Sequence, residues 1–434
     1  MNPNNQDKKR RHLSGEFFVV FGSQAVAALA GLVGLRFITT LLSKESFGEL
    51  ALAMTAVTLI QLFFTKPFTS AVRRFYAVSF DEKKFQQFSA SCWRLASILF
   101  ACIVVTGACC SFGLLSYSKH VSLLCVLAFL TAGLQAPADM AQSFQIAARN
   151  RVAAGVLNFT GQWLRVAGII GGVLLLSGDS VSAAIGMVGG YACWLLLQVI
   201  VFKKLFPSDY ERSLSPKEIW NWWKRLSTFA FPIAIWGFFI WLANSSSRWS
   251  LEFFQGSEEV GNFAVLYQLS YYPMYLIAIC IGELLTPILF GLAGNNTNKG
   301  QEFRAINIGS ISVVAVVVAS FMIVLLTIFV HPLVFKICVD QSYADISHFL
   351  PIMLLSSGFI AAAEVATLAV QTSGTNKQLA IPKVMTSVLG SALTVLGAYL
   401  YGLQGVLYAG LIYSATHVAW TVLLLYRLRK QIQN

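Results

Sequence analysis

Charged side chains interrupt several long apolar stretches of this sequence, and they are its strongest candidates for chemistry. An ionisable group inside hydrocarbon is costly, so each of these side chains is expected to face a protein interior and to meet a partner or a substrate. The basic members are Arg36, Lys66, Arg165 and Arg248, and the acidic members are Asp139, Glu252, Glu283 and Glu364.

The basic residues have polar and aromatic companions at helical spacing. At 100° per residue, Gln61 and Lys66 fall on one helix face, and Asn244 shares its apolar stretch with Arg248. Arginine pairs with phosphate through two parallel hydrogen bonds, and tyrosines offer flat faces and hydroxyls suited to sugars. A hydrated, basic cavity that binds an anion, with phosphate as the best candidate, is therefore predicted. Its substrate-binding residues are predicted to be Arg36, Lys66, Arg248, Asn244, Gln61, Tyr271 and Tyr275.

Structural roles compete with this interpretation for two of the cations. Arg248 and Glu252 are four residues apart on one helix face, so the two charges could simply neutralise one another. Lys66 could extend its ammonium group to nearby lipid headgroups. Arg36 has no such simple alternative, and a role in the cavity is expected for it.

The acidic residues could carry protons that couple transport to an ion gradient. Glu283, Glu364 and Asp139 are the candidates, although for Glu283 and Glu364 a pair with Lys66 or an arginine is equally open. For Asp139, a structural pair with Arg165 on the neighbouring helix is the expected arrangement. His417 lies within the last apolar stretch, where a helix–helix hydrogen bond is expected rather than a proton relay.

The apolar stretches that carry these residues define the fold class. Of the 434 residues, 56% are hydrophobic and only 12% are charged, about half the charged share of a soluble domain. Segments that cross hydrocarbon must satisfy their own backbone hydrogen bonds, so an all-α membrane protein of about twelve transmembrane helices is predicted. The predicted spans are 17–42, 48–72, 89–112, 120–142, 154–177, 181–202, 229–253, 260–290, 305–330, 350–372, 383–402 and 406–427.

The distribution of basic residues predicts the orientation. Most of the 31 Lys and Arg fall on one side of the predicted membrane if both termini are cytoplasmic, as the positive-inside rule requires. The net charge of +12 then reflects topology and attraction to anionic lipids rather than binding of nucleic acid. The sequence thus predicts a multi-pass protein of the bacterial inner membrane.

The longest polar interruption divides the spans into two sets of six. The predicted organisation is an N-terminal lobe at 1–202, a cytoplasmic linker at 203–228 and a C-terminal lobe at 229–434. Ser215, Pro216 and Glu218 form a helix-start signature before tryptophans interleaved with basic residues, so an amphipathic interfacial helix is expected in the linker. Such a helix could sense lipid, but a simple connection between the lobes is the favoured interpretation.

Short sequence echoes suggest that the two lobes are repeats. Residues 43–51 and 256–264 share a pattern of Ser, Glu and Gly, and each follows an arginine at similar distance. Gln145, Asn150 and Arg151 match Gln371, Asn376 and Lys377 at identical spacing. Six helices per repeat would make the two units parallel, an arrangement that transporters use for alternating access around a central cavity.

Enzymatic and metal chemistry find little support in the sequence. The eight Cys lie almost entirely within predicted spans and show no metal-ligand spacing, so neither a metal site nor a disulfide framework is predicted. A phosphate-binding glycine loop is also absent from the sequence, which excludes a Walker-type nucleotide hydrolase. We therefore expect no cofactor and no enzymatic activity.

Two segments of the chain resemble a known family. They are RFITTLLSKESFGELALAMTAVTLIQLFF, followed by Arg73 and Arg74, and FAFPIAIWGFFIWLANSSSRWSLEFFQGSEEVGNFAVLYQLS, from Phe229 to Ser270. They are similar to the polysaccharide transporters (Wzx-type flippases) of the multidrug/oligosaccharidyl-lipid/polysaccharide exporter superfamily. The family often places an acidic residue beside the basic one in the seventh span, where this chain has Ser247 before Arg248.

The resemblance implies a bacterial plasma-membrane flippase for an undecaprenyl-diphosphate-linked oligosaccharide, such as an O-antigen repeat unit. It implies that Arg36, Lys66 and Arg248 meet the diphosphate, and that a polysaccharide polymerase and a chain-length regulator are partners. A multidrug exporter of the same superfamily is the alternative, although it would favour an acidic or apolar cavity. A lipid-linked polymerase or glycosyltransferase would instead carry a large external loop with catalytic residues.

Overall fold

The computed structural model describes Gly22, Val26 and residues 28–206, 215–293, 299–372 and 376–433, and all regular elements of this part are helices. Nine of the described helical segments are long and apolar enough to cross a membrane, and Ala28–Leu41 is a shorter apolar helix. The predicted class of an all-helical membrane protein is thereby confirmed. The count of twelve spans and the repeat of two lobes stay predictions.

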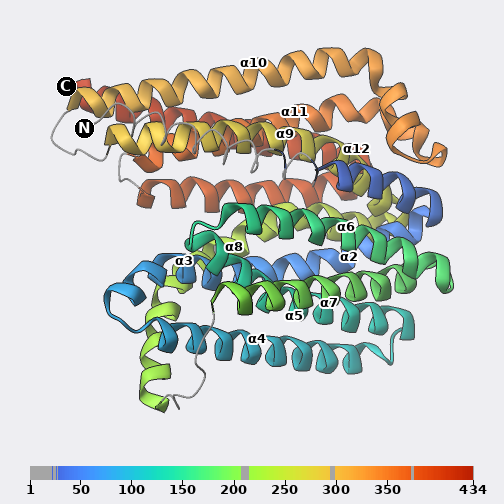
Figure 1. Cartoon of the computed structure of the whole chain (residues 1–434). Helices are drawn as coiled ribbons and strands as arrows, with labels where there is room; N and C mark the ends of the chain where they lie inside the picture. Colours follow the sequence, from blue (N-terminus) through green and yellow to red (C-terminus); the bar gives the residue numbers. More distant parts are fainter. Residues whose placement is uncertain are drawn as a thin grey trace. The chain divides into compact units, whose positions relative to one another are not determined.

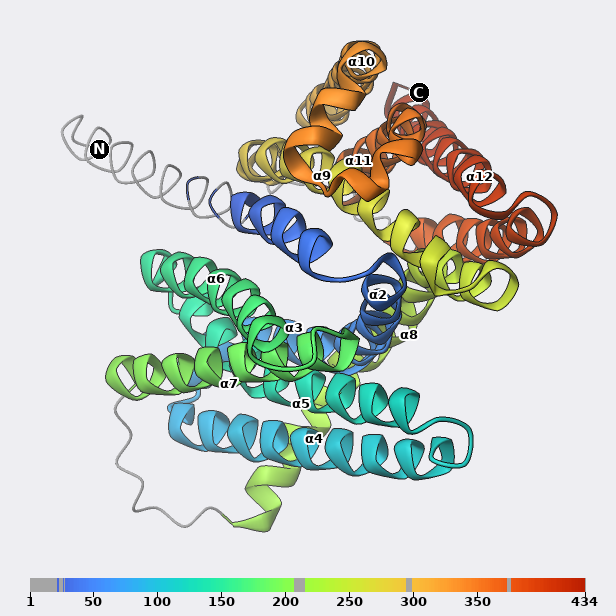
Figure 2. The same ribbon diagram turned by 90° about the vertical axis from the view of Figure 1, so that its right-hand side faces the viewer.

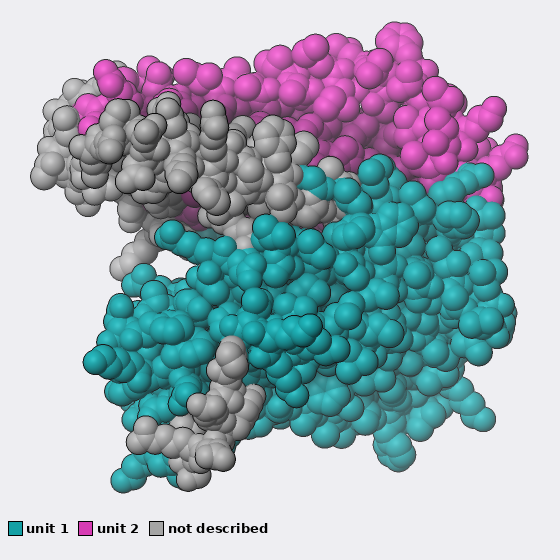
Figure 3. Space-filling model, in the orientation of Figure 1, with its two compact units in different colours: residues 1–241 teal, residues 242–434 magenta. Residues whose placement is uncertain are grey.

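The chain forms two compact units, residues 1–241 and 242–434, which Figure 3 colours separately. The first unit contains α2 (Lys44–Ile60), η1 (Gln61–Thr65), α3 (Lys66–Asp81), α4 (Phe85–Leu114), α5 (Lys119–Ala147), α6 (Arg151–Leu175), α7 (Ser180–Leu205) and the start of α8 (Pro216–Gln255). The second contains the end of α8 with α9 (Ser257–Ala293), α10 (Lys299–Cys338), η2 (Gln341–Phe349), α11 (Leu350–Thr372) and α12 (Asn376–Gln433). The boundary between the units falls inside α8.

Side-chain caps explain where several of these helices begin. The hydroxyl of Ser43 accepts from the Ser46 backbone N–H at the start of α2, and Ser118 does the same for α5. Asp179 accepts from the Ser182 backbone at 2.8 Å before α7. These oxygens satisfy N–H groups that have no partner within the helix. Hydrogen bonds from Ser182 also lower the pKa of Asp179 below its ordinary value.

Within the first unit, α4, α5, α6 and α7 run side by side, as both ribbon views show (Figures 1 and 2). A buried aromatic and aliphatic core joins α3, α4, α5 and α7 to the start of α8; it includes Phe88, Phe144, Phe202, Trp222 and Leu226. In the second unit, α11 packs against α9, α10 and α12. Many other apolar side chains, such as Leu325 and Phe329 on α10, are exposed, as expected where the surrounding solvent is lipid.

A π-helical turn interrupts the helix that the sequence predicts at 48–72. The Lys66 backbone N–H donates to the Gln61 carbonyl five residues earlier, which defines η1 between α2 and α3. Pro67 follows directly, and a proline cannot donate a backbone hydrogen bond, so the regular ladder fails in this turn. The extra residue rotates everything after it by about 100° relative to an ideal helix. The helix face that the sequence predicts from Gln61 to Lys66 is therefore broken between these two residues.

The helix α12 is a hairpin of two arms, residues 376–401 and 403–433. Gly402 lies between them at φ 55° and ψ −135°, outside the helical region. The arms touch so closely near this turn that a Cβ on Gly405 would lie 2.1 Å from the Gly397 carbonyl oxygen. The Thr386 hydroxyl also lies 3.1 Å from His417 Nδ1 across the hairpin. The helix–helix hydrogen bond predicted for His417 is thus confirmed.

Replacing Gly402 with alanine is expected to destabilise the second unit by about 1–3 kcal/mol, because a side chain makes this backbone conformation strained. Gly410→Ala is the matched control in the second arm, where a Cβ would meet only Ser356 Oγ at an ordinary 3.8 Å. Thermal unfolding of the purified protein measures both variants. Equal melting temperatures for the two would mean that the turn tolerates a side chain.

Candidate functional site

The first unit contains a polar network around Asp139, which α5 carries just after Pro137. The Gln61 side-chain amide donates to the Gln135 side-chain oxygen, which ties the π turn to α5. Gln135 lies four residues before Asp139 on the same helix, so the two side chains share a face of α5. Three cations, Arg165, Lys66 and Arg73, act electrostatically on this carboxylate. The π turn thus delivers a polar side chain to the interior of the unit, as such turns often do at functional sites.

Arg165 approaches Asp139 electrostatically but makes its hydrogen bonds elsewhere. Its guanidinium donates to the Tyr191 hydroxyl at 3.0 Å and to the Gly161 carbonyl at 2.9 Å. The same group lies over the rings of Tyr191 and Trp194, 4.9 and 5.3 Å from their centroids. The direct Arg165–Asp139 pair expected from the sequence is therefore replaced by contacts between α6 and α7. Asp139 keeps the attraction of the cations without a direct ion pair in the described part of the chain.

The other residues predicted for the first unit differ in exposure. Lys66 is exposed and Gln61 is half-buried. Arg36 is half-buried on the helix Ala28–Leu41, which touches α6 where Gly34 meets Val166. The hydroxyl of Thr40 donates to the Arg36 carbonyl at 2.8 Å.

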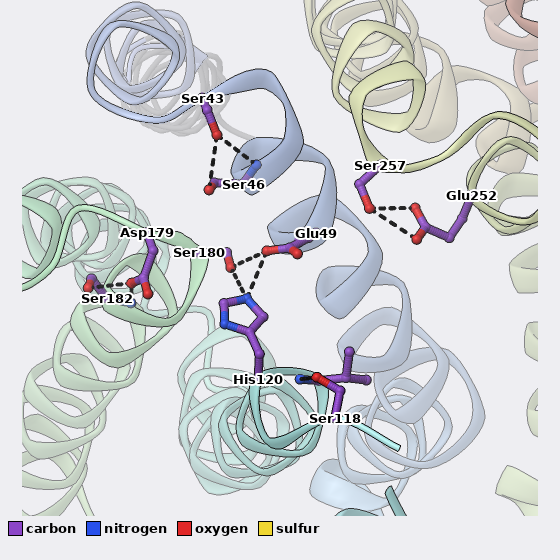
Figure 4. Close-up of polar contacts among 11 residues, drawn as sticks. Ser43, Ser46, Glu49, Ser118, His120, Asp179, Ser180, Ser182, Glu252 and Ser257 are labelled. Carbon is purple, nitrogen blue, oxygen red and sulfur yellow. Dashed lines mark hydrogen bonds and ion pairs between the residues drawn. The ribbon is translucent and has the colours of Figure 1, made fainter. Parts of the chain in front are cut away.

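In the second unit, Arg248 and Glu252 do not neutralise one another. Glu252 accepts hydrogen bonds from the Ser257 hydroxyl at 2.8 and 3.0 Å, so it closes the turn between α8 and α9 (Figure 4). The Arg248 guanidinium lies instead over the ring of Tyr267, 4.9 Å from its centroid, and over Phe263 at 5.8 Å. Its buried Nε has no hydrogen-bond partner within the described residues. Arg248 is thus a cation held by aromatic faces, with an unused donor. Asn244 lies half-buried one turn earlier on α8.

A ladder of tyrosines continues from Arg248 along α9. Tyr267 and Tyr271 stack with centroids 5.0 Å apart and planes 10° apart, and Tyr271 and Tyr275 stack at 5.2 Å and 16°. Both faces of Tyr271 are therefore covered by neighbouring rings. The flat face that the sequence suggests for sugar stacking is not available there. The ladder can offer phenolic hydroxyls to a ligand, and Tyr275 at its end is 46% exposed.

The acidic residues predicted for coupling fall in different surroundings. Glu364 on α11 forms an ion pair with Lys383 Nζ at 3.0 Å, and its own side chain remains half-exposed. The sequence left open a pair of this carboxylate with Lys66 or an arginine, but its partner is Lys383. Asp139 belongs to the network of the first unit. Glu283 lies on α9, but its side chain is outside the described part of the structure.

Sequence reasoning missed one polar cluster, in which Glu49, His120 and Ser180 join the ends of α2, α5 and α7 (Figure 4). His120 Nε2 lies 2.9 Å from both Glu49 Oε2 and Ser180 Oγ, and the Ser180 hydroxyl also donates to Glu49. Serine and glutamate contact the same ring nitrogen, whereas a catalytic triad needs them on opposite nitrogens. Ser180 is fully buried, so the cluster fastens three helix ends. Only the position of all three residues at the starts of predicted spans could have indicated their proximity.

These features define the class of protein, a multi-pass helical membrane protein with ionisable groups inside its helical units. A family model described as "Polysaccharide biosynthesis protein" matches residues 14–292, and the chain belongs to this family. No curated protein sequence matches the chain.

Solved structures of transporters share the fold. An inward-facing multidrug resistance MATE family transporter of the MOP superfamily has a TM-score of 0.71 at 14% identity, covering 94% of this chain and 96% of its own. The lipid II flippase MurJ, in an inward closed conformation, has a TM-score of 0.72 at 14% identity, with 94% and 86% covered. A mutant of the Vibrio cholerae MATE transporter VcmN has a TM-score of 0.59 at 14% identity, with 97% and 98% covered. At such low identity these similarities concern the fold alone.

Proposed function

We propose that this protein is a flippase that moves an undecaprenyl-diphosphate-linked oligosaccharide across the bacterial inner membrane by alternating access. Membership in the polysaccharide biosynthesis family supports a substrate from that chemistry. The fold shared with a lipid II flippase supports movement of a lipid-linked molecule. The orientation with both termini in the cytoplasm is part of the proposal.

The observation that carries the proposal is the state of Arg248. Its neighbour Glu252 is occupied by Ser257, and its Nε is buried without an acceptor within the described residues. A buried donor without an acceptor costs free energy. Such a costly group inside a membrane protein is expected where a ligand supplies the missing acceptor. A phosphate oxygen is the acceptor that suits this donor best, because arginine binds phosphate with strong, charge-assisted hydrogen bonds.

The remaining predicted residues have supporting roles in the proposal. The hydroxyls of Tyr271 and Tyr275 would bind sugar hydroxyls, since their row on α9 begins beside Arg248. Lys66, Arg36 and Gln61 would act on the substrate from the first unit, and Asn244 would assist Arg248. Asp139 and Glu364 are proposed as the groups that respond to the coupling ion. Glu283 keeps the same predicted role from its sequence position.

Binding to the purified protein tests the proposal. A polyprenyl-diphosphate oligosaccharide is expected to bind at least about tenfold more tightly than the same oligosaccharide on a neutral lipid, because charge-assisted hydrogen bonds to the diphosphate are lost. Arg248→Ala should abolish this preference and leave binding of the neutral lipid unchanged. The rival class is a multidrug exporter, for which the Asp139 carboxylate would attract organic cations. Tight binding of an organic cation, lost in Asp139→Asn, together with no preference for diphosphate would favour that rival.

A further inference from the structure

The start of α8 and the turn between α3 and α4 line an open cavity that the proposed transport function does not use. Figure 1 shows the beginning of α8 running across the helix ends where α3 turns into α4. The cavity has a volume of 790 Å³, and all of its lining residues belong to the first unit. It lies on the side of the membrane that the basic residues predict to be cytoplasmic.

Hydrogen bonds from three residues of α8 hold this cavity in shape. Glu218 accepts from the Gln87 side chain at 2.7 Å, and Trp223 donates from its indole to the Ser91 carbonyl at 3.0 Å. Arg225 donates to Glu82 at 2.8 Å. On the same helix, Trp222 and Leu226 are buried in the core of the unit. The amphipathic segment thus docks on protein, a partner that the sequence did not reveal, while Trp220 remains 65% exposed.

The charged residues around the cavity are three cations and two carboxylates. The cations are Lys84, Lys224 and Arg225. The carboxylate of Glu82 forms ion pairs with two of them, at 2.8 Å to Arg225 and 3.6 Å to Lys84. The hydrogen bond from Arg225 lowers the pKa of Glu82, so this carboxylate stays ionised and already engaged. Glu218, the other lining carboxylate, already accepts hydrogen bonds from the Gln87 side chain and from the Ser215 backbone N–H. Lys224 has no acceptor within the described residues, so the site can accept one further anionic group.

The wall of the cavity is aromatic, and it borders a surface suited to lipid. Phe75 and Phe229 meet edge to face at 5.9 Å, and Trp222 completes this wall. Phe231, two residues further along α8, is 65% exposed. Large exposed aromatic side chains next to basic ones are typical of the membrane–water interface. A ligand with a charged group and an apolar chain could therefore contact the cations with the first and the aromatic surface with the second.

We propose that this cavity binds the phosphodiester headgroup of an anionic phospholipid between Lys84 and Lys224, with the acyl chains against the outer face of α8. The headgroup joins the α3–α4 turn to α8 and so reinforces the Arg225–Glu82 contact. Because α8 leads out of the first unit, the lipid holds the beginning of this connection in place. Free phosphate shares the headgroup's chemistry but would gain nothing from the apolar surface.

The test uses the full-length protein in phosphatidylcholine nanodiscs with and without phosphatidylglycerol. Phosphatidylglycerol is expected to raise the melting temperature of the wild type, and the double variant Lys84→Gln, Lys224→Gln should lose this increase. Native mass spectrometry of the same proteins should show retention of phosphatidylglycerol reduced by about tenfold or more in the double variant, since each basic residue near a membrane contributes to binding of anionic lipid.

The matched control is Lys203→Gln, Lys204→Gln, which removes the same charge from exposed residues at the end of α7, outside the cavity. The control should respond to phosphatidylglycerol as the wild type does. An equal loss in the control would show a general surface effect and overturn the proposal. A full response of the cavity variant would overturn it as well. Stabilisation by glycerol phosphate as large as that by phosphatidylglycerol would identify the ligand as free phosphate rather than lipid.

Discussion

Replacing Arg248 with methionine is expected to raise the melting temperature of the protein while lowering its transport activity at least about tenfold. Methionine has a similar length but no charge, and the substitution removes the cost of a buried Nε without a hydrogen-bond partner within the described residues. The contact of the guanidinium with Tyr267 offsets part of this gain, so the free energy of unfolding should rise by about 1–2 kcal/mol. The loss of transport follows if a charge-assisted hydrogen bond to the substrate disappears.

The control for this prediction is Arg304→Met on α10, because Arg304 is exposed and its charge is already solvated. It should change neither quantity appreciably. Melting curves followed by tryptophan fluorescence and initial transport rates measure the two effects independently. A lower melting temperature with normal transport in Arg248→Met would contradict the prediction, because it would make Arg248 a structural residue.

The second large effect is expected where α6 and α7 cross in the first unit. Gly168 and Gly172 on α6 face Gly186 and Gly190 on α7, so each helix carries two glycines one turn apart. A Cβ on Gly186 would lie 2.0 Å from the Gly168 carbonyl oxygen, and one on Gly168 would lie 2.3 Å from the Gly186 carbonyl oxygen. Small residues at this spacing let two membrane helices approach until their backbones touch.

Gly186→Val should therefore destabilise the protein by about 3 kcal/mol or more, because backbone atoms cannot move aside unless the helices separate. Gly189→Val provides the control, since Gly189 is exposed on the same helix and has open space around its Cβ position. Its effect should stay within about 1 kcal/mol, the range of helix propensities. Melting temperature and the yield of folded protein in detergent measure both variants. Similar losses in the two would mean that the close crossing contributes little.

The sequence predicted the class of fold because hydrocarbon imposes a strong constraint on composition. Long apolar runs must become helices, and many of the predicted spans correspond to described helices, for example 89–112 within α4 and 120–142 within α5. Ser215 and Glu218 form the predicted capping box, with the Ser215 N–H donating to Glu218 at 3.0 Å. Local signals of this kind are complete within a few residues of sequence.

Details of the candidate site could not be predicted, because they depend on neighbours that sequence spacing does not specify. The spacing of Arg248 and Glu252 allows a pair, but Ser257 competes for the carboxylate once the chain turns into α9. The sequence suggested flat tyrosine faces for sugars, yet the stacking along α9 covers both faces of the Tyr271 ring. The π turn before Lys66 altered a face that was calculated from ideal helical geometry. Each case involves a side chain or backbone interaction absent from simple periodicity.

The central claim is that a basic site selects a diphosphate-linked lipid for transport. The most direct measurement is movement of a fluorescent polyprenyl-diphosphate oligosaccharide in proteoliposomes, with the wild type compared with Arg36→Ala and Arg248→Ala. The claim predicts that the wild type moves the lipid, and that both variants fold, as judged by melting curves, but fail to move it. A wild type that leaves the lipid in place under proton and sodium gradients, yet exports an organic cation, would contradict the claim and identify a drug exporter.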